Sequence, residues 1–214
     1  MQLHLYYAPG TCSFVPHVAL ELIRETGQDF TSTLINLRNG EQLKPEYQAI
    51  NPRGQVPALI VDGKLVTQVM AIIDFLNNQF PQARLLPTEA MARAEVLSTL
   101  AWMNNTVHPT FTRVFRPERF ATEDSKAAVK ETALEQFKSY LAEIDALVKG
   151  KQFIAGNQLT GADCYALAFI RWAGLARINP QDYANYWTYV QEIAALPVIS
   201  RIMQKEGIEL VTYK

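Results

Sequence analysis

The residues with the clearest chemical potential are a cysteine and a serine at the predicted start of the first helix. Cys12 and Ser13 follow a strand pattern over residues 2–7 and the turn Pro9-Gly10. A thiol at a helix N-terminus meets unpaired backbone N–H groups and the positive end of the helix dipole, and both favour the thiolate. We therefore expect the pKa of Cys12 to fall about two units below the value of about 8.5 for a free thiol. The alternative is a small, inert, buried cysteine, and Ser13 is either the helix cap or a donor to a ligand sulfur.

His108 is the second candidate for chemistry. It lies on the apolar side of a predicted long helix with Phe111 and Phe115, where a neutral core histidine is a common outcome. Pro109 follows it, and we expect this proline to bend or end the first part of the helix.

The remaining thiol and imidazole groups give weaker signals. Cys164 lies inside an apolar helix pattern and is interpreted as inert packing. His4 and His17 have no acidic or cysteine neighbours at ligand spacing, so no metal site is predicted.

Short alternating elements surround Cys12. The Asp62-Gly63 dipeptide is a strong hairpin signal between two apolar runs. The segments that precede this hairpin are predicted to be a strand, a helix and a second strand. The helix would form a right-handed crossover, so the two strands would pair in parallel. This order predicts an α/β, thioredoxin-like domain with a mixed sheet and helices on its faces. The predicted strands are 2–7, 30–37, 57–61 and 64–66, and the predicted helices run from residue 14 and over 46–50 and 68–79.

Beyond a proline-containing linker over residues 81–88, the pattern changes to long helical periods. Thr160 and Asp163 form a capping-box pattern at the start of an almost wholly apolar helix. We therefore assign residues 1–80 to the thioredoxin-like domain and residues 89–214 to an all-α helical bundle domain. The predicted helices of this bundle are 89–115, 124–149, 161–177, 182–195 and 198–206.

Composition narrows the class of protein. With 49% hydrophobic and 19% charged residues, the chain can bury a core and is not a disordered sequence. A net charge of −1 with scattered basic residues predicts no nucleic-acid partner and no membrane partner. The longest apolar stretch, 165–176, is shorter than the roughly 20 residues that span a bilayer, and no signal-peptide pattern opens the sequence. Two distant cysteines suit free thiols, so we expect a cytoplasmic location.

Three segments resemble the glutathione-binding elements of bacterial, beta-class glutathione S-transferases. They are Tyr7-Ala8-Pro9-Gly10-Thr11-Cys12-Ser13, then Asn51-Pro52-Arg53-Gly54-Gln55-Val56-Pro57-Ala58-Leu59, and Thr67-Gln68 before Ala71-Ile72. The resemblance continues through His108, 111–117 and 160–165 and so covers nearly the whole chain. It implies a transferase of the detoxifying kind, a homodimer, and glutathione as co-substrate with no other cofactor.

The resemblance also implies roles within a glutathione site. The Val56–Pro57 bond would be cis, so that the backbone of Val56 pairs with the cysteinyl part of glutathione. Gln68 and Val69 would hold the γ-glutamyl carboxylate, but the family commonly has Glu then Ser there, so glutathione affinity is expected to be reduced. Arg38 would face the glycyl carboxylate, although a solvated loop cation is nearly as good an interpretation. Gln55 completes the expected glutathione-binding residues.

For the second substrate, the resemblance places His108 across from the cysteine and near the glutathione thiol. Pro109 stands where the family often has Lys, which would reshape the pocket. The expected walls of a pocket for a hydrophobic electrophile are Phe111, Phe115 and Trp172, and core packing explains these residues equally well.

The expected activity is therefore conjugation of glutathione to small hydrophobic electrophiles, with thiol–disulfide exchange through Cys12 as a second branch. Glutathione-dependent peroxidase or dehydroascorbate reductase activity is an alternative. A non-catalytic binding or regulatory protein on the same fold is another, and Gln68, Val69 and Pro109 keep it open.

Overall fold

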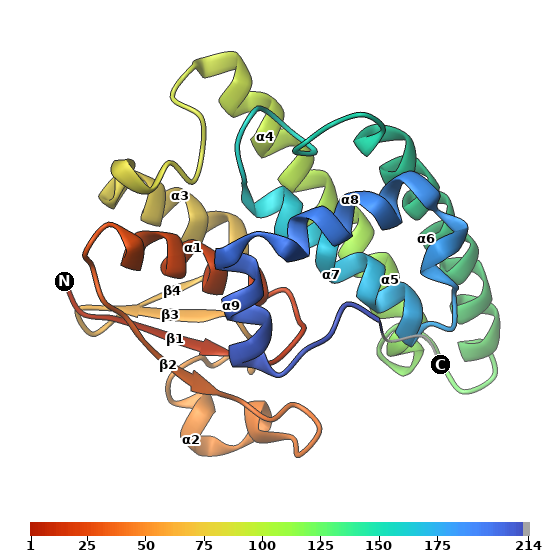
Figure 1. Ribbon diagram of the computed structural model, residues 1–214. Helices are drawn as coiled ribbons and strands as arrows, with labels where there is room; N and C mark the ends of the chain where they lie inside the picture. The colour runs from red at the N-terminus through yellow and green to blue at the C-terminus, as the bar shows by residue number, and fades with distance from the viewer. Residues whose placement is uncertain (212–214) are drawn as a thin grey trace. The chain divides into compact units, whose positions relative to one another are not determined.

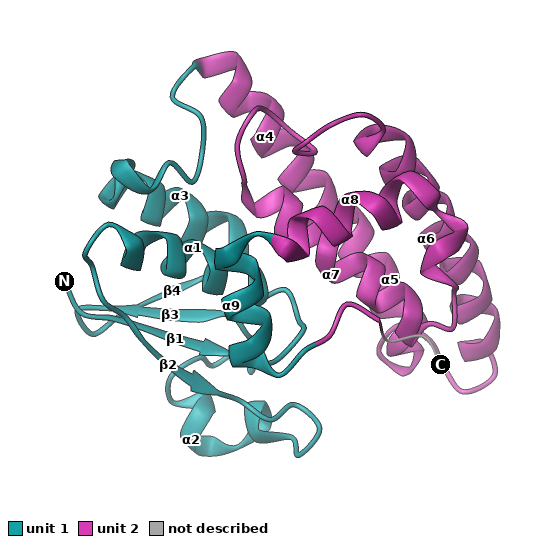
Figure 2. Cartoon of the chain, viewed as in Figure 1, with its two compact units in different colours: residues 1–89, 196–208 teal, residues 90–195, 209–214 magenta. Residues whose placement is uncertain are grey.

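The computed structural model describes residues 1–211, and the chain divides into two compact units (Figure 1, Figure 2). Unit 1 comprises Met1–Glu89 and Leu196–Ile208, and unit 2 comprises Ala90–Ala195 with the residues from Glu209 onward. The sequence assigned everything after residue 89 to the helical domain, whereas the structure groups 196–208 with the first unit. The expected end of that domain, residues 212–214, lies outside the described residues.

Unit 1 contains a four-stranded mixed sheet in the order β2-β1-β3-β4. β1 (Leu3–Tyr7) pairs in parallel with β2 (Thr31–Leu34) and antiparallel with β3 (Ala58–Val61), which pairs antiparallel with β4 (Lys64–Thr67). Asp62 and Gly63 both have positive φ, as a two-residue hairpin turn requires, so the hairpin prediction is confirmed. The predicted thioredoxin-like arrangement is confirmed.

Helices cover both faces of this sheet (Figure 1). α1 (Phe14–Glu25) and α3 (Val69–Gln79) lie on one face, and the short α2 (Pro45–Gln48) lies on the other. In β1 every second side chain is apolar and buried, and in α1 and α3 the buried apolar side chains recur at helical spacing. Both patterns agree with the sequence. Short 3₁₀ turns at Glu41–Leu43 and Pro81–Ala83 complete this part of the chain.

The last helix, α9 (Pro197–Glu206), packs against α1 within unit 1 (Figure 2). Glu21, almost fully buried on α1, accepts from Arg201 Nε on α9 at 2.9 Å and also pairs with Arg24. A second, more exposed ion pair joins Arg201 to Glu25. Two segments about 180 residues apart in sequence therefore form one packed pair of helices.

Unit 2 is helical among its described residues, as predicted. α6 (Lys126–Val148) carries buried side chains every three or four residues, and α5 (His108–Phe115) packs along it. No helix among residues 1–211 combines the length and apolar character needed to cross a bilayer. The α-helices are α4 (Ala90–Trp102), α5 (His108–Phe115), α6 (Lys126–Val148), α7 (Gly161–Leu175) and α8 (Ala184–Ala195), with 3₁₀ turns at Pro117–Arg119 and Pro180–Asp182.

The predicted helix 89–115 contains a π-helical turn, Met103–Val107, directly before His108 and Pro109. Proline has no N–H to donate and its ring crowds the carbonyl four residues earlier, so a wider turn relieves both problems. Thr110 and Thr112 donate their hydroxyls to the carbonyls of Thr106 and His108. The proline thus reshapes the helix without ending it.

The start of α7 confirms the predicted capping box. Thr160 Oγ1 accepts from the backbone of Ala162 at 3.3 Å, and Asp163 accepts from the backbone N–H of Thr160 at 2.6 Å. Every residue from Gly161 to Gly174 is buried, so the predicted central position of this helix in the bundle is also confirmed.

Candidate active site

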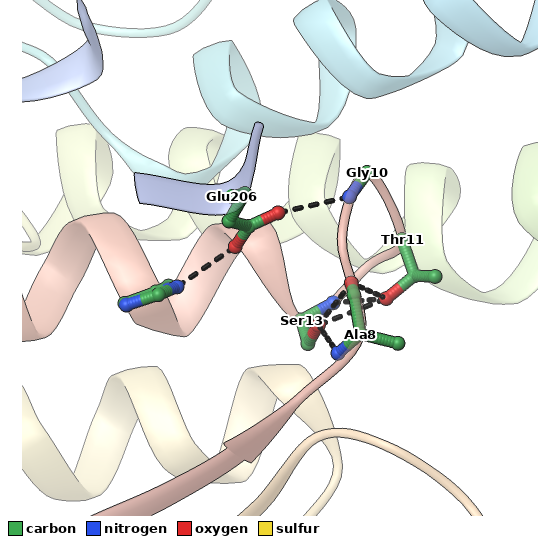
Figure 3. A network of polar contacts seen from close by, with 6 residues as sticks. Ala8, Gly10, Thr11, Ser13 and Glu206 are labelled. Carbon is green, nitrogen blue, oxygen red and sulfur yellow. Dashed lines mark hydrogen bonds and ion pairs between the residues drawn. The ribbon is translucent and has the colours of Figure 1, made fainter. Parts of the chain in front are cut away.

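A loop between β1 and α1 carries the predicted chemistry, and it is tied together by hydroxyl groups (Figure 3). Ser13 Oγ accepts from the backbone N–H of Ala8 at 3.0 Å and lies 3.1 Å from the Ala8 carbonyl. Thr11 Oγ1 donates to the same carbonyl at 2.9 Å and lies 2.8 Å from Ser13 Oγ. These bonds close residues 8–13 into a compact turn.

Ser13 is fully buried and forms no side-chain cap on α1, so the prediction that it caps the helix is wrong. Its hydroxyl instead turns back to Ala8, because the N–H and carbonyl of that residue lie within the turn. Thr11 Oγ1 accepts from the backbone N–H of Ser13 at 3.3 Å, and the carbonyls of residues 11–13 accept from N–H groups in the first turn of α1.

A carboxylate from the far end of the chain holds this turn from outside (Figure 3). Glu206, at the end of α9, is 5% exposed and accepts from the backbone N–H of Gly10 at 2.8 Å. Its other oxygen lies 2.8 Å from His17 Nδ1 on α1. Glu206 therefore joins the turn, α1 and α9 through a single buried group.

His17 is fully buried within unit 1. Its ring lies 4.5 Å from the Tyr7 ring and 5.9 Å from the Phe30 ring, centroid to centroid, and its Nε2 has no hydrogen-bond partner among the described residues. A proton on Nδ1 gives Glu206 its hydrogen bond from this ring. His17 thus orients Glu206 from the side opposite the turn.

Cys12 lies in the turn two residues before α1 and contacts a second segment of the predicted site. Its Sγ lies 3.6 Å from the carbonyl oxygen of Val56, to which the thiol donates. The side chain is buried, and this burial raises the pKa of the Cys12 thiol to about 12, although the backbone N–H groups of Cys12 and Ser13 act in the opposite direction. The expected fall in pKa is therefore wrong: removal of the thiolate from water outweighs the helix terminus.

The second segment is a rigid turn that leads into β3. Val56–Pro57 is a cis peptide bond, as the resemblance implied. Buried Asn51 accepts from Arg53 N–H at 3.2 Å and donates to the Gln55 carbonyl at 2.7 Å, and Tyr47 OH donates to that carbonyl as well. The side chain of Gln55 itself is exposed.

The third segment lies at the end of β4. Arg53 donates from Nη1 to Thr67 Oγ1 at 3.3 Å, so the 51–59 turn touches the residue before Gln68. Gln68 is exposed with φ of 72°, and Val69 is buried at the first position of α3. The structure thus places Cys12 against Val56, and Arg53 against the residue before Gln68, all within unit 1.

Arg38 lies exposed in the loop after β2. Its backbone N–H and that of Asn39 donate to Asn36 Oδ1 at 3.1 Å. These contacts fix the loop and leave the role of the guanidinium group a prediction.

The predicted residues of the second substrate pocket form one aromatic cluster in unit 2. Phe111 stacks on Trp172 at 4.7 Å and on Phe115 at 5.7 Å between ring centroids. Phe111 and Trp172 are buried, whereas Phe115 is 53% exposed and carries the Arg116 guanidinium over its ring. Two of the three side chains are therefore core residues, and Phe115 alone presents substantial surface.

His108 belongs to the same cluster, with its ring 4.8 Å from Trp172 and 6.2 Å from Tyr165. Burial lowers the pKa of His108 to about 4, so the imidazole is neutral at physiological pH. It can therefore act as a hydrogen-bond donor or acceptor but not as a resident cation.

Sequence reasoning missed Glu206 and Thr11, and it considered His17 only as a metal ligand. Thr11 carried a local signal, because a hydroxyl in the turn before a helix can accept from the backbone N–H two residues later. Glu206 carried none, because its partners lie 189 and 196 residues away. The described residues contain no group of three or more histidine, cysteine or acidic side chains placed to hold a metal ion.

A mixed sheet, a cysteine at the first helix and a cis-proline turn beside it, followed by a helical unit, define a thioredoxin-like ligand-binding protein. The sequence matches the family models described as the glutathione S-transferase N-terminal domain over residues 1–78 and the glutathione S-transferase C-terminal domain over residues 102–197. The chain belongs to the glutathione S-transferase family.

Relatives and solved structures agree over nearly the full length. The sequence is 31% identical to glutathione S-transferase GstA of Escherichia coli O157:H7, covering 97% of this chain and all of that one. A glutathione transferase homologue from Sulfitobacter with bound glutathione superimposes with a TM-score of 0.88 at 25% identity, covering 97% and 99% of the two chains. A beta-class glutathione S-transferase from Sphingomonas chungbukensis gives 0.81 at 28% identity, covering 96% and 100%.

Proposed function

We propose that this protein is a glutathione transferase that conjugates glutathione to small hydrophobic electrophiles. The observation that carries the proposal is the contact among the three motif segments of unit 1. The Cys12 thiol meets the Val56 carbonyl, and the Arg53 guanidinium meets Thr67 beside Gln68. These contacts connect one edge of the sheet to the starts of α1 and α3, and the similar Sulfitobacter protein binds glutathione.

In this proposal the tripeptide lies along the Val56 backbone as an added strand. The cysteinyl N–H of glutathione donates to the Val56 carbonyl. In the structure the Cys12 thiol donates to this carbonyl, so glutathione replaces that contact. Cys12 is then free to donate its S–H to the glutathione sulfur and to stabilise the ligand's thiolate as a neutral neighbour. The Thr11–Ser13–Glu206 contacts keep the turn rigid while this exchange of partners occurs.

The reaction itself is a substitution or an addition at carbon. The glutathione thiol gives its proton to water, and the thiolate forms a carbon–sulfur bond with the electrophile. In a substitution, the bond to the leaving group breaks and the leaving group departs with its electron pair. The protein contributes binding, orientation and thiolate stabilisation.

The buried state of Cys12 favours conjugation over thiol–disulfide exchange. With its pKa near 12, only about one thiol in ten thousand is ionised at pH 8, and the nucleophile of exchange is the thiolate. Peroxidase or reductase chemistry through Cys12 would therefore require the turn to open first.

For the electrophile, we propose the cluster of His108, Phe111, Phe115 and Trp172, with Phe115 as the exposed aromatic surface. Arg38 is proposed for the glycyl carboxylate. We also propose a cytoplasmic homodimer with a role in detoxification, and a glutathione affinity lowered by Gln68 and Val69.

The decisive experiment combines binding and turnover. Titration calorimetry with glutathione, together with an assay using 1-chloro-2,4-dinitrobenzene as the electrophile, should show both binding and conjugate formation. The Cys12→Ala variant should still bind and conjugate glutathione, but more slowly, because it lacks the S–H donor to the ligand thiolate. Absence of both binding and conjugation in the unaltered protein refutes the proposal and leaves a non-catalytic role on this fold.

A second measurement separates conjugation from exchange. After treatment with oxidised glutathione at pH 7.5, intact mass spectrometry should show little glutathione adduct on Cys12 in the folded protein. Protein unfolded in urea is the control, and both cysteines should react there. Rapid, stoichiometric modification of folded protein would favour the exchange branch.

A further inference from the structure

Arg53 is a charged residue of the 51–59 segment that the sequence interpretation left without a role. It follows Pro52 in the turn before the cis Val56–Pro57 bond, and its side chain is exposed. Its Nη1 reaches across to Thr67 Oγ1 at 3.3 Å, at the end of β4. The guanidinium therefore lies beside the residue that immediately precedes Gln68 and α3.

The backbone beneath Arg53 is fixed on both sides. Asn51 accepts from the Arg53 N–H at 3.2 Å, and the N–H of Gly54 donates to the Asn51 carbonyl at 2.9 Å. Gly54 has φ of 58°, and a Cβ there would lie 2.8 Å from the carbonyl oxygen of Gln42. Only glycine suits this close approach, so the turn has little freedom and holds Arg53 at one place on the sheet edge.

The segment that the Arg53 guanidinium contacts is uncharged. Thr67, Gln68 and Val69 carry no charge, and the first turn of α3 has no acidic residue. Val69 is buried and apolar, so it offers no side-chain hydroxyl to a ligand. A guanidinium is suited to bind a carboxylate because it presents several N–H donors in one plane.

We infer that Arg53 binds the γ-glutamyl carboxylate of glutathione. This inference rests on the proposed function, and it adds a binding residue to that same site. Arg53 supplies the charge-assisted hydrogen bonds at the end of β4, where Val69 supplies no hydroxyl. The Thr67 hydroxyl orients the guanidinium. When the carboxylate binds, the guanidinium either keeps this contact or replaces it with one to the carboxylate.

The test removes the charge from the protein and the carboxylate from the ligand in turn. Calorimetry compares the unaltered protein with R53Q, R53K and, as a charge control on β4, K64Q. The ligands are glutathione, a 4-aminobutanoyl-cysteinyl-glycine analogue that lacks only the γ-glutamyl carboxylate, and γ-glutamylcysteine, which lacks the glycyl carboxylate. R53Q should bind glutathione and γ-glutamylcysteine about tenfold more weakly than the unaltered protein, as expected for one exposed charge-assisted contact.

With the 4-aminobutanoyl analogue, R53Q and unaltered protein should bind equally, because the partner of Arg53 is then missing from both. R53K should recover part of the lost affinity, and K64Q should match the unaltered protein. In steady-state assays the KM for glutathione should rise in R53Q while kcat stays nearly unchanged, as for a contact made equally before and during reaction.

The outcomes that overturn the inference are distinct from failure of the proposed function. Equal glutathione affinity of R53Q and unaltered protein refutes the role of Arg53, as does an equal loss with the 4-aminobutanoyl analogue. A loss that disappears with γ-glutamylcysteine assigns Arg53 to the glycyl carboxylate and also refutes it. Lack of glutathione binding by the unaltered protein instead refutes the proposed function itself.

Discussion

Two buried carboxylates, one in each unit, hold loops in opposite ways. Asp163 in unit 2 accepts from the backbone N–H groups of Thr160 and Ile154, 3 and 9 residues away, and from Tyr189 OH. Glu206 in unit 1 accepts from Gly10 and His17, which lie 196 and 189 residues away. The first loop is fixed by its own neighbourhood, whereas the second depends on a helix from the other end of the chain.

The difference separates stability from function. Asp163 fixes the start of a buried helix, so its removal should lower the stability of the whole of unit 2. Glu206 fixes the turn that carries Cys12, so its removal should mainly loosen the proposed glutathione site. The following variants test this contrast.

The largest effect is expected for Asp163→Ala. It removes the shared acceptor of four donors, the N–H groups of Ile154 and Thr160 and the hydroxyls of Thr160 and Tyr189, and of these the Ile154 N–H keeps a second acceptor in Tyr189 OH. We expect a loss of about 3 to 5 kcal/mol in the free energy of unfolding. Urea unfolding followed by circular dichroism measures it. Asp124→Ala, at an exposed position, is the control and should change stability by less than about 0.5 kcal/mol. A small loss in Asp163→Ala would show that the capping contacts matter little.

Glu206→Ala should cost less, about 2 to 3 kcal/mol, because two donors rather than four lose their acceptor. Its glutathione affinity should fall as well, since the turn that carries Cys12 is no longer fixed at Gly10. Hydrogen exchange of the Gly10 amide, compared between variant and unaltered protein, reports the loosening directly. An unchanged exchange rate at Gly10 would contradict the proposed link between α9 and the turn.

His108, at the start of α5, lies against Tyr165 and Trp172 of α7, and its effect on stability depends on pH. Because burial lowers its pKa to about 4 in the folded protein, the unfolded chain binds a proton near pH 6.5 before the folded chain does. Stability should therefore fall by about 1 to 3 kcal/mol as the pH drops from 6.5 to 4. His108→Phe should lack this part of the acid sensitivity, and identical pH profiles of the two proteins would be evidence against it.

The smallest effect is expected for Arg201→Gln. Arg201 joins α9 to Glu21 and Glu25, but its side chain is 42% exposed, so these ion pairs are weakened and screened by salt, and buried Glu21 keeps its pair with Arg24. The urea midpoint should move only slightly, and the difference should vanish in 1 M sodium chloride. A shift as large as that of Glu206→Ala would mean that the surface pairs, and not the buried carboxylate, attach α9.

These contrasts also explain what the sequence could reveal. The Thr160–Asp163 cap, the Asp62-Gly63 hairpin and the helical periods are local signals, and the structure confirms them. The Cys12 pKa could not be predicted, because it depends on burial by residues distant in sequence. Ser13 was misassigned as a side-chain cap because only the folded turn brings the backbone of Ala8 within reach of its hydroxyl.

The return of α9 to unit 1 has a consequence for how the protein is made. A ribosome releases the strands and helices of unit 1 early, but the acceptor for Gly10 is not synthesised until codon 206 is read. During translation the nascent first unit therefore exposes the face of α1 that α9 later covers. A messenger RNA truncated before that codon would encode the sheet and Cys12, but the turn beside Cys12 would lack its contact with Glu206.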